Sequence, residues 1–226
     1  MRPLIMSILI FVSNVSLGQF ALISDKDGYA NIRTSAQPGS KITDTLHNGH
    51  LVYCYETDGN WSYIDFSRKK MDNTGYVYHN RLKFTSVYEK IPRLAGPNGT
   101  FGKDSLNVVI TLQPFIRSKH RITYQKGSKT VVQFIDAKQY WGDDGEVPKI
   151  GYQSIHIHFG DREIILPETA FEDLYEPTLR TTEVYFDRQN DILYIQADNS
   201  DGAGAYSVIW RIEKGVYLDR FVDVGL

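Results

Sequence analysis

The sequence predicts a mainly β protein: a small closed barrel followed by a second, mostly antiparallel β domain (α+β) with one short helix. Three observations predict this fold class. Short runs of alternating apolar and polar residues, typical of half-buried strands, recur along the chain. Clusters of Gly, Pro, Asn and Asp separate these runs and supply turns. Aromatic residues make up 13% of the 226 residues, and aromatic side chains favour strands.

Residues 1–18 differ from the rest of the chain. A basic residue, Arg2, precedes an apolar run over residues 4–12, and Ser16 and Gly18 are small residues at the positions that determine cleavage. This pattern predicts a secretory signal peptide cleaved after Gly18, because the run is shorter than the roughly 20 residues of a membrane span. We therefore expect a secreted or periplasmic protein that has no membrane span after cleavage.

Residues 19–83 carry the strands of the predicted barrel. An apolar and aromatic run at residues 51–55 is followed by a turn at Asp58-Gly59-Asn60, and residues 61–66 then alternate. Alternation bounded by Asp, Gly and Asn is typical of strands joined by tight turns. Several such strands within fewer than about 70 residues suit a small closed barrel.

Four spaced anchors in this stretch point to a known module: Asn31-Ile32-Arg33, Gly49-His50-Leu51-Val52, Gly59-Asn60-Trp61 and Gly75-Tyr76-Val77. With these residues the stretch resembles the bacterial SH3-like domain. The resemblance covers about a quarter of the chain. It implies an SH3-like barrel over residues 19–83 that binds cell-wall peptidoglycan or a peptide.

A linker is predicted at residues 84–105, because Pro92 and the Gly96-Pro97-Asn98-Gly99 run are loop formers. Residues 106–226 then form the second domain. The predicted strands there cover residues 106–112, 121–124, 130–135, 154–159, 163–166, 183–186, 192–197, 206–212 and 216–222.

One short amphipathic helix is predicted between Pro167 and Pro177, with an acid in its first turn. The last three strands are predicted to form a meander, turned at Asn199–Gly202 and Glu213–Gly215. This half is similar to a domain of unknown function that follows SH3-like modules in exported bacterial proteins. That likeness lies in residues 140–148, 173–177 and 199–204.

The reactive side chains give little sign of catalysis. The single cysteine, Cys54, lies between two tyrosines in a predicted strand, which favours a structural role over that of a nucleophile. His156 and His158 share one face of their strand and could begin a zinc site, but such a site needs a third ligand. A polar outer face of a half-buried strand is the other interpretation. The sequence therefore predicts no catalytic residues and no cofactor.

Aromatic side chains offer the better candidates for binding. A small barrel cannot bury all of its tyrosines, and exposed rings suit sugar rings or extended peptides. Tyr55, Tyr63 and Tyr78 are the candidates for an exposed groove. Trp61 also belongs to the candidate set, although Trp61 and Tyr76 match structural anchors of the SH3-like pattern.

Charge narrows the choice of partner. The formal net charge is −2, and residues 84–226 hold 16 Lys and Arg against 20 Asp and Glu, so nucleic acid is not expected. We expect an exported, non-catalytic binding protein whose partner is peptidoglycan or an exported protein. An inhibitor or immunity protein for an exported enzyme or toxin is the alternative, and a metal-dependent hydrolase at His156 and His158 is a third hypothesis. Oligomeric state and ligand identity stay open.

Overall fold

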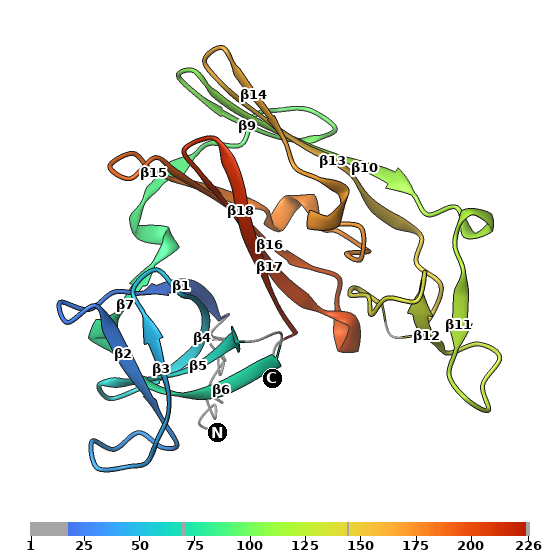
Figure 1. The fold of residues 1–226 in the computed structure, drawn as a ribbon. Helices are drawn as coiled ribbons and strands as arrows, with labels where there is room; N and C mark the ends of the chain where they lie inside the picture. The colour runs from blue at the N-terminus through green and yellow to red at the C-terminus, as the bar shows by residue number, and fades with distance from the viewer. Residues whose placement is uncertain (1–17, 69–70, 144, 225–226) are drawn as a thin grey trace, which may run out of the picture.

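A computed structural model describes residues 18–68, 71–143 and 145–224 of this chain. The predicted signal peptide thus lies outside the described residues, except for Gly18. The predicted mainly β fold is confirmed, with antiparallel sheets throughout (Figure 1). No helical segment in the described part of the chain is long and apolar enough to cross a membrane.

The first half forms one curled, barrel-like sheet of seven strands, called the barrel below and ordered β3-β2-β6-β5-β4-β1-β7 (Figure 1). Its strands are β1 (Gln19–Ile23), β2 (Tyr29–Arg33), β3 (Ile42–His47), β4 (Leu51–Asp58), β5 (Trp61–Arg68), β6 (Met71–Tyr78) and β7 (Leu82–Phe84). Among the described residues its edge strands β3 and β7 do not pair with each other, so the structure has an open curl where the sequence predicted a closed barrel. Successive side chains of a strand point to opposite faces, so one apolar set from each strand points to the inside of the curled sheet. Cys54, Ile64, Phe66 and Val77 belong to this inner core. Burial raises the pKa of the Cys54 thiol, which suits a packing role.

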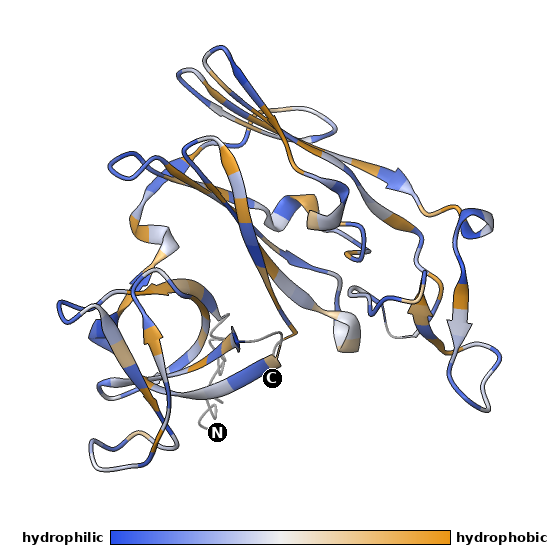
Figure 2. Cartoon of the chain, viewed as in Figure 1, coloured by the Kyte–Doolittle hydropathy of each residue, from blue (hydrophilic) through white to orange (hydrophobic). Residues whose placement is uncertain are grey.

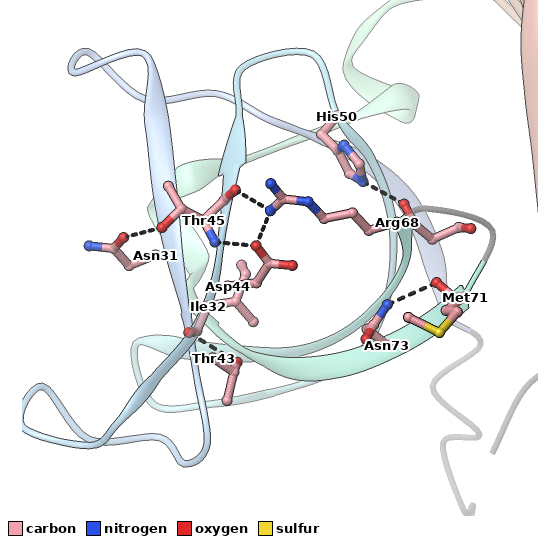
Figure 3. A network of polar contacts seen from close by, with 10 residues as sticks. Asn31, Ile32, Thr43, Asp44, Thr45, His50, Arg68, Met71 and Asn73 are labelled. Atoms are coloured by element: carbon pink, nitrogen blue, oxygen red, sulfur yellow. Dashed lines mark hydrogen bonds and ion pairs between the residues drawn. The ribbon is translucent and has the colours of Figure 1, made fainter.

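Side chains help to hold the curl together. Figure 3 shows Arg68, the last residue of β5, reaching Asp44 and the Thr45 carbonyl oxygen of β3, although β3 and β5 are not neighbours in the sheet. His50 Nε2 lies 3.1 Å from the Ser67 carbonyl oxygen nearby. These contacts link the edge strand β3 to the middle of the sheet.

The second half is a sandwich of two sheets. Its five-stranded sheet is ordered β18-β17-β16-β15-β8, and its four-stranded sheet is ordered β14-β13-β10-β9. The strands are β8 (Glu89–Ile91), β9 (Gly99–Lys103), β10 (Leu106–Pro114), β13 (Ile150–Phe159), β14 (Arg162–Ile165), β15 (Glu183–Asp187), β16 (Ile192–Asn199), β17 (Tyr206–Glu213) and β18 (Val216–Asp223). A separate hairpin pairs β11 (Ile122–Tyr124) with β12 (Val132–Ile135). Each predicted strand of this half thus overlaps an observed strand.

The structure differs from the predicted linker at residues 84–105. Two strands lie inside that range: β8 pairs with β15, and β9 pairs with β10. Ile91 and Phe101 are buried in the core between the two sheets. The Pro and Gly residues between them turn the chain from one sheet to the other, so this segment belongs to the sandwich.

The five-stranded sheet is covered on both faces. Its inner face, including Val208 and Trp210, packs against the four-stranded sheet, and its outer face, including Ile209, packs against the barrel. Phe20 and Tyr53 of the barrel lie in that outer contact. Because both faces of the sheet are covered, β17 is buried without a break from Tyr206 to Trp210. Figure 2 shows apolar and polar segments alternating along the strands. The molecule therefore has three packed layers.

The predicted helix between Pro167 and Pro177 is reduced to one 3₁₀ turn, Glu168–Ala170. The Ala170 carbonyl oxygen accepts hydrogen bonds from Trp210 Nε1 (2.7 Å) and from Arg220. Further on, the Tyr175 N–H donates to the Trp141 carbonyl oxygen, and the Trp141 N–H donates to the Asp173 carbonyl oxygen. Tertiary partners thus satisfy backbone groups that a longer helix would have paired internally.

Candidate functional site

The barrel presents aromatic side chains on the outer face of β4, β5 and β6. Cross-strand neighbours in an antiparallel sheet share a face, and two adjacent rows of neighbours cross these strands. The rows are Glu56–Tyr63–Tyr76 and Asp58–Trp61–Tyr78. Within β4, β5 and β6 each row therefore consists of one carboxylate and two aromatic rings, and Arg33 of β2 pairs with Tyr76 beyond the first row.

The rings within each row touch. Trp61 and Tyr78 stack with centroids 4.0 Å apart, and the Tyr63 and Tyr76 rings are 5.0 Å apart at 53°. Tyr63, Tyr76 and Tyr78 are half-buried, whereas Trp61 is 7% exposed. The candidates Tyr63 and Tyr78 thus lie on the same face, and the buried Trp61 ring stacks on the Tyr78 ring. Tyr76 lies on this face too, although the sequence matched it to a structural anchor of the SH3-like pattern.

Tyr55 has a different position from the other candidates. Its hydroxyl lies 2.6 Å from Asp223 Oδ2 and 3.0 Å from Asp65 Oδ2, and its ring packs against the contact between the barrel and the five-stranded sheet. Burial, followed by the charge of Asp223, raises the pKa of Asp65 to about 6. Tyr55 therefore links two layers of the fold, next to the aromatic rows.

His156 and His158 extend from the exposed face of β13, as the alternation predicts, while Ile155 and Ile157 are buried. Glu163 of the neighbouring strand β14 lies 3.5 Å from His156 Nδ1 and 3.8 Å from His158 Nε2. Among the residues that the structure describes, no three His, Cys, Asp or Glu side chains are grouped so as to hold a metal ion. The structure thus adds a carboxylate neighbour to the pair without completing a metal site.

A cavity of about 320 Å³ lies in the second half, at residues that the sequence did not indicate. It is lined by Gln113 and Pro114 at the end of β10, by residues 151–153 of β13 and by Ile135 of the β11–β12 hairpin. Figure 1 shows this hairpin at the end of the sandwich away from the barrel. Phe115, Tyr140 and Tyr175 form the aromatic wall of the cavity. The Phe115 and Tyr175 rings meet edge to face, with centroids 5.3 Å apart.

A histidine–carboxylate pair lies on the hairpin side of this cavity. His120 stacks on Phe115 with centroids 4.3 Å apart, and its Nδ1 lies 2.7 Å from Asp136 Oδ2. Burial alone would raise the pKa of Asp136, but the hydrogen bonds from His120 and from the Arg121 backbone N–H lower it. An ionised carboxylate only accepts hydrogen bonds, so His120 Nδ1 donates to Asp136 and Nε2 is left for another partner.

Two acids of the predicted helix also line the cavity. Glu172 pairs with Lys138 at 2.5 Å, and Asp173 makes two hydrogen bonds of 2.6 Å with Arg220. Both acids lie in the segment for which the sequence predicted one short helix. No local pattern could indicate the cavity, because its wall combines residues 113–120, 135–140 and 168–175.

Comparisons of this chain with family models, curated proteins and solved structures give no match.

Proposed function

We propose that this protein is an exported, non-catalytic binding protein that holds an extended peptide on the aromatic rows of its barrel. The stem peptides of cell-wall peptidoglycan are the ligand class that we favour. The observation that carries the proposal is the repeated row of one carboxylate and two rings. Export is inferred from the pattern of residues 1–18.

The spacing of the rows supports an extended ligand. Trp61 and Tyr63 are two residues apart in β5, so the rows are about 7 Å apart. Successive side chains on one side of an extended peptide have this same repeat of about 7 Å. Two neighbouring side chains of the ligand could therefore each rest on one pair of rings.

Charge supports a ligand that carries amino groups. Glu56 and Asp58 are both exposed at the ends of the two rows. A free amine next to a ring and a carboxylate gains cation–π and ion-pair contacts. A polyanion would be repelled by these two acids, so the face favours a peptide over a nucleic acid or a phosphate polymer.

Retention on purified cell walls tests this proposal. We expect the wild-type protein to sediment with walls and the Tyr63→Ala/Tyr76→Ala variant to lose at least about tenfold in affinity, because stacked rings are lost. Tyr29→Ala is the matched control, since Tyr29 is 43% exposed on β2 outside the rows. Wild-type retention no greater than that of an unrelated protein, or equal retention of the double variant, would defeat the proposal.

A further inference from the structure

The cavity beside the β11–β12 hairpin has features that the proposed peptide-binding function does not use. Its volume of about 320 Å³ is at the lower end of the range for small-molecule sites, which is about 300–1,000 Å³. It combines an aromatic wall with several oriented polar groups, as small-molecule sites do. We propose that this cavity binds a neutral sugar ring, packed against Phe115, Tyr140 and Tyr175, with one hydroxyl donating to His120 Nε2.

The charges of the cavity argue against an anionic ligand. The carboxylates of Glu172 and Asp173 pair with Lys138 and Arg220, and the Asp136 carboxylate accepts a hydrogen bond from His120. Lys119 and Glu168 also line the cavity, so its wall holds four carboxylates against the two lysines Lys119 and Lys138. A phosphate or carboxylate ligand would therefore meet an excess of negative charge.

The polar groups also argue against a purely apolar ligand. Such a ligand would remove water from the His120–Asp136 and Lys138–Glu172 pairs without replacing its hydrogen bonds, which costs free energy. A sugar ring avoids this cost because it has two kinds of surface. Its C–H groups pack on an aromatic face, and its hydroxyls exchange hydrogen bonds with side chains at the rim.

Side chains that can form hydrogen bonds with several sugar hydroxyls line the cavity together with the aromatic wall. With Nδ1 held by Asp136, His120 Nε2 is the ring nitrogen left for a sugar hydroxyl, and the amides of Gln113 and Gln153 on β10 and β13 can both donate and accept. The His120 ring is fixed by its stack on Phe115 and by Asp136. A ring held on two sides loses little freedom on binding, which favours affinity for a small ligand.

The backbone beside this pair is strained, which indicates that the fold holds the pair in place. Asp136 and Ala137 form the turn after β12, and both have positive φ, 52° and 61°. Alanine in this region costs roughly 1 kcal/mol or more. The turn nevertheless brings the Asp136 carboxylate to both His120 and the Arg121 N–H.

Saturation-transfer NMR with the purified protein tests the proposal. The ligands are the methyl glycosides of glucose, galactose, mannose and N-acetylglucosamine, with glucuronic acid and glucose 6-phosphate as charged comparators. We expect at least one neutral glycoside to bind with a millimolar or lower Kd, and the charged sugars to bind more weakly. Phe115→Ala and His120→Gln should each weaken binding by about tenfold, since each removes one contact with the ring.

Matched controls separate this site from the barrel. Phe134→Ala removes an exposed ring of β12 outside the cavity, and His158→Gln removes a histidine on β13, so both should bind like the wild type. The Tyr63→Ala/Tyr76→Ala variant should also keep its sugar binding. Absence of transfer to every glycoside, preferential binding of the charged sugars, or undiminished binding by Phe115→Ala and His120→Gln would overturn the proposal. Loss of sugar binding in the Tyr63→Ala/Tyr76→Ala variant would also overturn the sugar proposal. Failure of the wild-type protein to bind cell walls would defeat the proposed peptide binding but leave the sugar proposal standing.

Discussion

Asp65 and Asp223 approach each other through the Tyr55 hydroxyl where the barrel meets the five-stranded sheet. Two carboxylates at one partly buried place are hard to ionise together, because burial and like charge both favour the neutral form. Burial is the larger cause for Asp65, and the charge of Asp223 adds to it. The contact between these layers should therefore respond to pH.

We predict that Asp65→Asn stabilises the protein at neutral pH. The pKa of Asp65 is raised from 3.8 to about 6 in the folded state, so its contribution to stability is complete below pH 3.8 and is lost as pH rises through about 6. Since asparagine resembles the protonated acid, the variant should gain about 1 kcal/mol over the wild type at neutral pH, after allowance for solvent screening. This gain should disappear in acid.

Urea denaturation at several pH values from acid to neutral measures this difference. Asp161→Asn, at an exposed residue of the β13–β14 turn, serves as the control and should leave the pH dependence unchanged. A difference between Asp65→Asn and the wild type that is the same at every pH would contradict the prediction.

The curl of the first sheet depends on how closely β2 approaches β6. Arg33 and Tyr76 pair there, and Gly75 lies next to this pair. A Cβ atom at Gly75 would meet Ile32 Cγ2 at 2.5 Å and the Arg33 carbonyl oxygen at 3.0 Å. Glycine is therefore required here by the close approach of two strands rather than by a turn conformation.

We predict that Gly75→Ala destabilises the protein by about 1–3 kcal/mol, because the added methyl group overpacks the inner core. Strand propensity alone would predict the opposite sign, since alanine loses less conformational entropy than glycine on folding. Thermal unfolding measures the change. Gly39→Ala is the control, because a Cβ atom there has no neighbour within 4 Å. An unchanged or raised Tm for Gly75→Ala would show that β2 can move away without cost.

The contact between the barrel and the sandwich is apolar and couples the two halves. Eight buried residues form it: Phe20, Leu22, Leu51, Tyr53, Tyr185, Tyr194, Ile209 and Phe221. Polar contacts add to it, including Ser207 Oγ to the Tyr53 hydroxyl at 3.1 Å and Arg211 to the Gly49 carbonyl oxygen at 2.7 Å. A contact of this kind favours unfolding in one step.

We predict that Ile209→Ala lowers the free energy of unfolding by about 2–5 kcal/mol, because it leaves a cavity at a fully buried position between two layers. Both halves should be affected together. Hydrogen exchange of β5 and β17 amides should therefore report the same decrease. Ile42→Ala, at a residue 45% exposed on β3, should change little. Barrel amides that stay protected while those of β17 exchange would contradict this coupling.

Local patterns were sufficient to predict most strands. The alternation of Ile155, Ile157 and Phe159 placed His156 and His158 on the exposed face. The last meander is present and its second turn lies at Lys214-Gly215, but its first connection is longer than predicted and runs over residues 200–205, with a 3₁₀ turn at Gly202–Gly204. The exposed face and the second turn both depend on neighbours within a few residues, so the sequence contains them directly.

The candidate sites were predicted less completely. The sequence offered Tyr63 and Tyr78 as candidates for an exposed groove, whereas the structure leaves both half-buried. The sequence did not indicate the pairing of strands that aligns them with Glu56, Asp58 and Tyr76. Nor did it indicate that Phe115 lies against both His120 and Tyr175. Such neighbours come from strand register and from loops that meet in space, which no single stretch of sequence specifies.

By itself, the sequence determined a chain of short antiparallel strands, because alternation and turn residues are local properties. Only the tertiary structure decided that residues 89–91 and 99–103 are strands of the sandwich, that the segment after Pro167 is a single 3₁₀ turn, and that three layers share one body. The physical reason is that these outcomes depend on which distant partner satisfies each backbone group and covers each apolar face.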